Sequence, residues 1–176
     1  MRKAKNIKQE ETVELLNKCW MTHDGMWFFH CLQEFGIEAA NKINKSAIKS
    51  LSAIEIARVK KALDCTAPIE DFNEFKQFFH EAANLMIPDF MNVKFAYPDK
   101  NKMAWEFNQN KCFAYTGMKR LGVVAQYECG VLYRIKCWLD ELGIKHKFNP
   151  GIGKCHMQVK GSCSGEIQLF LSVKNA

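Results

Sequence analysis

The sequence predicts an α+β protein, in which N-terminal helices precede an antiparallel sheet with helices packed on one face. Two periodicities indicate this class. Residues 1–88 repeat apolar side chains at helical spacing, whereas residues 89–176 contain short segments in which apolar and polar residues alternate. With 176 residues and 48% hydrophobic side chains, the chain is long and apolar enough for one core. We therefore expect residues 1–176 to form a single domain.

The first half of the sequence is predicted to be helical, with several short breaks. The polar segment 22–25 separates the first two helices, and Gly36 ends the second. Ser52 and Glu55 have the spacing of a capping box, which predicts that a new helix begins at Ser52. The expected helices cover residues 9–19, 26–36, 37–48, 52–63 and 71–86.

The second half is predicted to follow the order β-β-α-α-β-β-β. Segments 91–97 and 103–107 alternate apolar with polar or small residues around a Pro-Asp-Lys-Asn turn, which predicts a hairpin with one buried face. Residues 161–165 are expected to form another turn. The other expected elements are helices at 110–121 and 127–142 and strands at 144–148, 155–159 and 167–171.

Composition and charge exclude several classes of protein. No stretch approaches the ~18 consecutive apolar residues of a transmembrane helix, so we expect no membrane partner. The basic residues 1–5 are not followed by an apolar segment, so no secretory signal is predicted. Eight cysteines without an export signal indicate reduced thiols and a cytoplasmic location. Residues 111–176 carry ten basic and four acidic side chains, but no run of five basic residues, which argues against nucleic acid as a partner.

The first candidate site is the adjacent pair His23 and Asp24, which lies between Trp20 and Trp27. An aspartate beside an imidazole can fix its tautomer and raise its basicity, so this pair is a candidate catalytic base or metal-binding group. The alternative is structural. In that interpretation Asp24 caps the second helix and His23 is a partly buried polar residue.

The second candidate site is a set of cysteines in the C-terminal half. Cys129 is expected near the start of a helix, where unpaired backbone N–H groups lower a thiol pKa. Together with Cys155, Cys163 and a further ligand, either Cys112 or His23, it could hold zinc or iron. A simple hairpin would separate Cys155 from Cys163 by roughly 20 Å at ~3.3 Å per residue, so a shared metal needs a turn that folds back. The alternatives are unlinked packing residues or a disulfide.

Aromatic residues provide a third candidate site, an apolar cavity for a small molecule. Arg134 lies on an otherwise apolar helix and could bind a carboxylate of the ligand. The alternatives are that the aromatic side chains form the core and that Arg134 belongs to a solvated face. The expected cavity wall consists of Trp27, Phe28, Trp105 and Tyr115.

Several segments resemble known families. Residues 20–40, which contain His-Asp-Gly-Met-Trp-Phe-Phe, and residues 112–143 resemble an uncharacterised family of small bacterial and archaeal cytosolic proteins. That family is similar to the L-2-amino-thiazoline-4-carboxylic acid hydrolase family. The order Cys129, Cys155, Gly161, Cys163 is also similar to a vinyl-reductase-type small-molecule-binding domain. These resemblances imply an α/β plait with added helices.

Three functions follow as expectations from the sequence. The first is a small-molecule-binding domain, with zinc or iron held by the cysteines as a further expectation. The second is a hydrolase that breaks a C–N or C–S bond of a thiazoline-like substrate, with His23 as the base and Asp24 orienting it. The third is a structural module that forms a homodimer through its aromatic helices.

Overall fold

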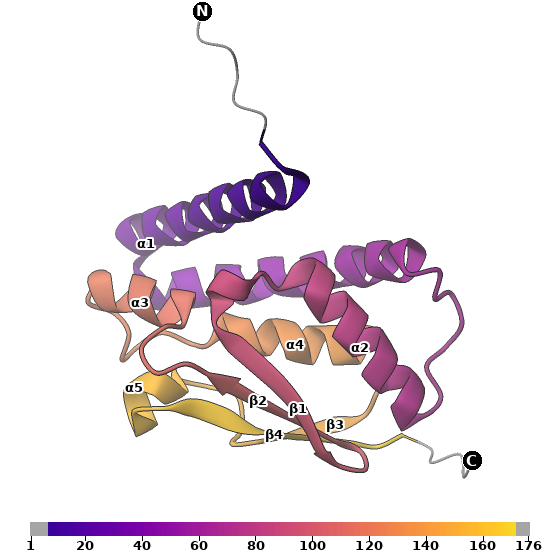
Figure 1. Cartoon of the computed structure of the whole chain (residues 1–176). Helices are drawn as coiled ribbons and strands as arrows, with labels where there is room; N and C mark the ends of the chain where they lie inside the picture. Colours follow the sequence, from indigo (N-terminus) through magenta and orange to yellow (C-terminus); the bar gives the residue numbers. More distant parts are fainter. Residues whose placement is uncertain (1–6, 172–176) are drawn as a thin grey trace, which may run out of the picture.

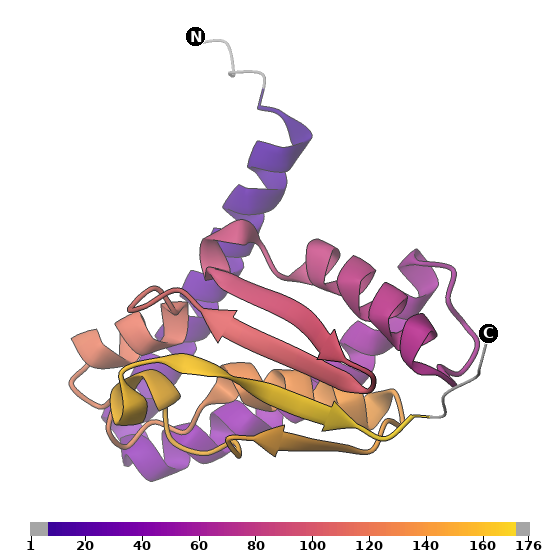
Figure 2. The same cartoon turned by 60° about the horizontal axis from the view of Figure 1, so that its bottom comes forward.

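The computed structural model describes residues 7–171, which form a four-stranded antiparallel sheet with helices on one face (Figure 1, Figure 2). The strand order is β1-β2-β4-β3, so the predicted α+β class is confirmed. The elements are α1 (Gln9–Ala62), α2 (Phe72–Met86), the 3-10 helix η1 (Asp89–Met91), β1 (Val93–Asp99), β2 (Lys102–Phe107), α3 (Phe113–Arg120), α4 (Gly130–Glu141), β3 (His146–Asn149), α5 (His156–Lys160) and β4 (Cys163–Leu169).

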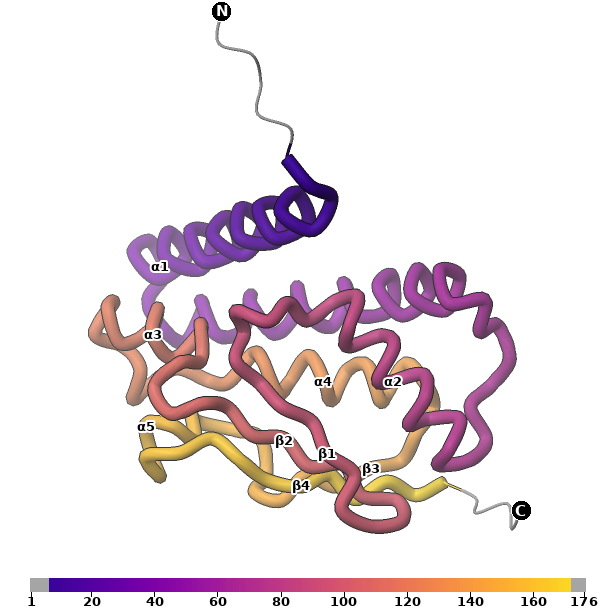
Figure 3. Tube along the Cα trace, in the orientation of Figure 1, coloured from indigo at the N-terminus to yellow at the C-terminus, as the bar shows by residue number. Residues whose placement is uncertain are grey.

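Helix α1 runs through most of the predicted helical half and is bent once, at Gly36 (Figure 3). Gly36 has a φ of 78°, a left-handed conformation that glycine adopts without steric cost. The predicted boundary at Gly36 is therefore confirmed as a bend. We call residues 9–35 the arm and residues 37–62 the second half of α1. Figure 1 shows the bend turning the arm away from the line of the second half.

The other two predicted breaks in α1 are wrong. Residues 22–25 stay helical, because helix propensities differ by less than about 1 kcal/mol per residue and four polar or small residues do not end a long helix. The hydroxyl of Ser52 donates a hydrogen bond to the carbonyl oxygen of Ile48 (2.8 Å) within the helix, and it does not cap a new one. The side chain of Glu55 is buried against α4, so the capping box is also wrong.

Helix α2 confirms the prediction for residues 71–86. The Asp71 carboxylate caps it by accepting hydrogen bonds from the backbone N–H groups of Asn73 (2.8 Å) and Glu74 (3.0 Å). Its buried face holds Phe75 and Phe79, and the Phe79 ring meets Phe95 of β1 edge to face at 5.1 Å. These contacts fix α2 along the β1 edge of the sheet.

The hairpin of β1 and β2 confirms the predicted alternation. Met103, Trp105 and Phe107 are buried on the face that the helices cover. Trp105 pairs across the ladder with Gly165 of β4. A Cβ at Gly165 would lie 2.5 Å from the Trp105 ring, so glycine is required where the indole crosses the strand.

The predicted strand at 155–159 is wrong, because these residues form the short helix α5. Cys155 and Met157 are buried while Val159 is exposed, so one of the three alternating apolar residues leaves the core. A short apolar run does not distinguish a strand from a helical turn. The predicted turn at 161–165 is shorter than expected, because β4 begins at Cys163.

Helix α4 packs against the second half of α1. A Cβ at Gly130 would approach Asn44 Nδ2 to 2.8 Å and Ile48 Cδ1 to 2.9 Å, so this glycine permits the close crossing. The buried stripe of α4 contains Ile135 and Trp138 as predicted, but Leu132 and Leu139 replace Val131 and Leu142. None of the helices described is long and apolar enough to cross a membrane.

Candidate functional site

A cavity of about 170 Å³ lies between the arm and the rest of the molecule. The arm contributes side chains at helical spacing, from Asn17 through Met21 and Asp24 to Phe28. Helix α4 and the second half of α1 form further walls, and the lining, which is mostly apolar, is completed by Tyr127, η1 and the ends of α2, β1, β2 and α3. The cavity therefore exists only because α1 bends at Gly36 and brings the arm over the other elements.

Phe28 and Arg134 are the two predicted ligand-binding residues that line this cavity. The Phe28 ring is buried and meets the edge of Tyr127 at 5.8 Å between ring centroids. Trp27 lies on the outer side of the arm, with 63% of its surface exposed. Trp105 belongs to the core beneath the sheet, and Tyr115 lies near a shallow surface hollow beside α3. The structure therefore does not bring these three residues to the cavity.

Arg134 is held by a buried carboxylate. Its Nε donates a hydrogen bond to Glu55 Oε2 (3.0 Å), and its terminal nitrogen donates to Glu55 Oε1. The Trp138 indole N–H donates to the same carboxylate (2.9 Å). The guanidinium lies 5.1 Å from the Trp20 ring and 5.7 Å from the Trp138 ring. Arg134 does bind a carboxylate, but that carboxylate belongs to the chain itself.

Asp24 is the acidic group at the cavity that lacks a protein partner. It lies at the rim, exposed to solvent on one side, and it has no hydrogen bond or ion pair within residues 7–171. Burial of its cavity side raises the pKa of the Asp24 carboxyl above the usual 3.8. The positive charge of Arg134, and to a smaller extent that of His23, opposes this shift. The carboxylate is thus partly desolvated and is available to a ligand.

The raised pKa of Asp24 predicts a pH-dependent effect of Asp24→Asn. Because the folded-state pKa lies above 3.8, the charged carboxylate destabilises the fold at neutral pH, and this penalty disappears as the pH falls through the raised pKa. We expect the ligand-free Asn variant to be more stable than wild type at pH 7, with the difference shrinking toward pH 3.8. Urea unfolding of both proteins across this range measures it. An Asn variant less stable than wild type at pH 7 would contradict the assignment.

The structure separates His23 from the cavity. Its Nε2 accepts a hydrogen bond from the Trp27 indole N–H (3.2 Å) on the exposed side of the arm. No hydrogen bond joins His23 to Asp24 among the described residues. Adjacent residues on a helix point about 100° apart, which explains why the sequence neighbours diverge. The alternative interpretation is also wrong, because α1 continues through Asp24, which caps no helix, and His23 is exposed.

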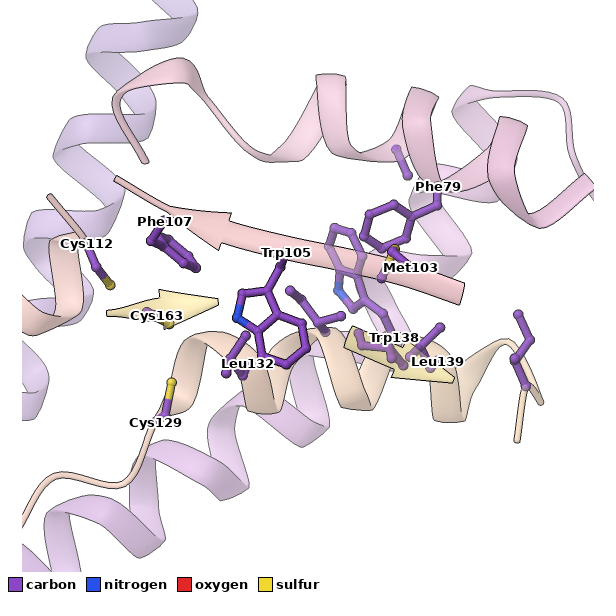
Figure 4. Close-up of a cluster of buried hydrophobic side chains, with 14 of the residues drawn as sticks. Phe79, Met103, Trp105, Phe107, Cys112, Cys129, Leu132, Trp138, Leu139 and Cys163 are labelled. Carbon is purple, nitrogen blue, oxygen red and sulfur yellow. The ribbon is translucent and has the colours of Figure 1, made fainter. Parts of the chain in front are cut away.

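Four predicted metal ligands do gather at one end of the core. Cys112, Cys129 and Cys155 precede α3, α4 and α5, respectively, and Cys163 begins β4. Figure 4 shows the Cys112, Cys129 and Cys163 side chains at the same end of the buried cluster. The charge of the Cys155 thiolate would raise the pKa of each of the other three, so Cys155 lies close to them as well. The helical turn of α5, in place of the predicted strand, brings Cys155 near Cys163.

The four thiols do not form a ready metal site. No group of three or more His, Cys, Asp or Glu side chains across residues 7–171 is arranged to hold a metal ion. Burial raises the pKa of the Cys129 thiol to about 12 and that of Cys163 to about 11. The N-terminus of α4 does lower the Cys129 pKa through the Leu132 N–H, but burial is the larger effect. The expected low pKa of Cys129 is therefore wrong, and zinc or iron stays a prediction that the side-chain geometry does not support.

The thiols also give a prediction about reactivity. All eight cysteines are free, and Cys19 is exposed whereas five others are buried. Because a buried thiol with a raised pKa forms little thiolate, we expect Ellman's reagent at pH 8 to modify Cys19 rapidly in native protein, and all eight thiols after unfolding. Rapid native modification of Cys129 would contradict the burial. Metal analysis of chelator-free protein tests the zinc or iron prediction in the same preparation.

Glu55, Trp20 and Trp138 belong to the site but are not among its predicted residues. The sequence contains a signal for Glu55. It is an acidic residue on the apolar side of one helix, Arg134 lies on the apolar side of another, and a buried charge is costly unless it is paired. The pairing itself depends on the α1–α4 crossing, which no local pattern predicts.

A family model described as a family of unknown function (DUF6125) matches residues 5–130. The matched segment contains the arm and most of the cavity lining but ends before Arg134. No curated protein and no solved structure matches the chain.

Proposed function

The chain belongs to DUF6125, a family of unknown function, and we propose from the geometry that it is a small-molecule-binding domain whose ligand occupies the cavity beneath the arm. One observation carries the proposal. A mostly apolar cavity contains the Asp24 carboxylate, which has no hydrogen bond or ion pair with any described residue, beside an Arg134–Glu55 pair whose charges compensate each other. Small-molecule sites combine an apolar wall with a few polar groups of this kind.

The size and charge of the cavity define the class of ligand. A cavity of about 170 Å³ holds a molecule of about one ring, since cavities near 150 Å³ accept benzene. The Asp24 carboxylate has no hydrogen bond or ion pair within residues 7–171, so the favoured polar group of a ligand is a protonated nitrogen. Phe28 also lines the cavity, and the face of an aromatic ring attracts such a cation, as the Trp20 ring already attracts the Arg134 guanidinium. We therefore expect a small apolar amine, and benzylamine is a suitable probe.

The alternative functions receive less support. A hydrolase needs a nucleophile and a base in one pocket, but the cavity is lined by Asp24 and by neither His23 nor any cysteine.

The eight free cysteines suit a reducing compartment, which supports the cytoplasmic location that we propose.

Filling the cavity from Gly25 tests the proposal without removing a core residue. Gly25 lines the cavity, and a Cβ built on it has no heavy atom within 4 Å. Because leucine is also a better helix former by roughly 0.5–1 kcal/mol, Gly25→Leu is expected to fold and to lose at least tenfold in affinity for benzylamine. Calorimetric titration measures the affinity.

Gly117→Leu is the matched control, because Gly117 is also helical and open but lies outside the cavity lining. It is expected to bind benzylamine as wild type does. Equal binding by wild type and Gly25→Leu would place the ligand elsewhere and would overturn the proposal.

A further inference from the structure

The outer side of the arm exposes an unusual number of large apolar side chains. Trp27 and Leu16, which both lie on the arm of α1, each have 63% of their surface exposed. Apolar residues surround most of the arm, and a helix that is apolar on all sides is normally covered by a partner. The exposed residues are Val13, Leu15, Leu16, Trp20, Met26, Trp27 and Phe35.

Part of this surface has the spacing of a helix-pairing seam. Val13, Leu16, Trp20, His23 and Trp27 follow one another at intervals of three, four, three and four residues. This is the spacing that places side chains between two helices in a coiled coil. The seam shares Trp20 with the lining of the cavity, so the two faces of the arm adjoin at this residue.

The charges of the arm leave the seam free for a similar helix. Between residues 12 and 33 the Asp, Glu, Lys and Arg side chains are Glu14, Lys18 and Asp24, and the titratable imidazoles are His23 in the seam and His30. Glu14 and Lys18 pair with each other one turn apart, and Asp24 lies at the cavity. Two copies of the arm can therefore approach through the seam without bringing like charges together.

We propose that a second copy of this chain covers the arm, with the two arms packed side by side along the seam. Pairing along the seam would remove the exposed parts of Val13, Leu16, Trp20 and Trp27 from water, and each of these side chains is at least 40% exposed. Because the seam is centred on Trp20, a two-fold axis through this residue matches each arm with itself.

Pairing of the arms would also affect the cavity. Trp20 contacts Arg134 from the arm, and Lys18 lies 5.6 Å from the Phe90 ring of η1. A partner that holds the outer face of the arm keeps it over these groups. The dimer is thus expected to stabilise the cavity wall, although its existence does not depend on any ligand.

The oligomeric state of the full chain tests the proposal directly. Sedimentation equilibrium of wild type is expected to give twice the chain mass of 20.3 kDa at micromolar concentrations. Leu16→Glu is expected to give a monomer with an unchanged circular dichroism spectrum, because Leu16 is exposed and its replacement removes no side chain from the core. Leu85→Glu is the control, since Leu85 is exposed to 52% on α2, away from the seam.

A cross-link separates arm pairing from other dimers. Cys19 is exposed and adjacent to Trp20, so a short bismaleimide is expected to link two chains, and Cys19→Ser to abolish the link. A wild-type monomer, or a dimer that Leu16→Glu leaves intact, would overturn the proposal. Arm-dependent binding of a monomer to anionic phospholipid vesicles would also overturn it, because the seam would then serve a lipid surface.

Discussion

Arg134→Met is expected to lower the free energy of unfolding by about 3–5 kcal/mol, because it leaves the buried Glu55 carboxylate without its cation. Glu55 has only 5% of its surface exposed, so water cannot replace the lost partner. The guanidinium also lies against Trp20 and Trp138, and its removal loosens the arm as well. Denaturation in urea, monitored by circular dichroism, measures the loss.

Two further variants show whether the buried charge is the cause. Glu55→Gln combined with Arg134→Met keeps an acceptor for the Trp138 N–H and removes the charge, so it is expected to recover at least half of the lost stability. Lys136→Met breaks an exposed pair with Asp140 on the same helix and is expected to cost less than about 1 kcal/mol. An Arg134→Met effect as small as that of Lys136→Met would show that Glu55 is solvated.

Gly165→Ala is expected to destabilise the sheet by about 3 kcal/mol, at the upper end of the usual cost of overpacking. The new methyl group would lie 2.5 Å from the Trp105 ring and 2.6 Å from the backbone oxygen of Asn149. The indole is enclosed in the core and the oxygen belongs to β3, so neither can move away freely. Thermal unfolding compares the variant with Gly151→Ala, where a Cβ has no atom within 4 Å and no loss is expected. Equal melting temperatures would contradict the close packing.

The sequence predicted those elements whose signals are local. Asp71 caps α2 through its own backbone neighbours, and the alternation in β2 reflects one covered face. The break at residues 22–25 and the strand at 155–159 were wrong for a common reason. In both segments the local preference is weak, and packing decides whether the residues form a helix. Contacts of the arm with distant elements cannot be read from a short window of sequence.

Part of the site was also predictable from the sequence. Phe28, Arg134 and Asp24 were singled out for their chemistry, and all three line the cavity. The sequence alone does not show that the His23 and Asp24 side chains point in different directions, because this follows from the helix that continues through both residues. The clustering of the cysteines was one of the alternatives that the sequence left open, and the burial and raised pKa of Cys129 and Cys163 depend on the surrounding core.

An amide-resolved NMR titration with benzylamine tests whether a small apolar amine binds beneath the arm. We expect saturable shifts confined to the cavity lining, at Gly25, Phe28, Gly130 and Arg134, with benzoate and toluene binding at least tenfold more weakly. Asp24→Asn is expected to remove the preference for the amine. The absence of saturable shifts, shifts outside the lining, or equal affinity for benzoate would show that the cavity does not bind an amine.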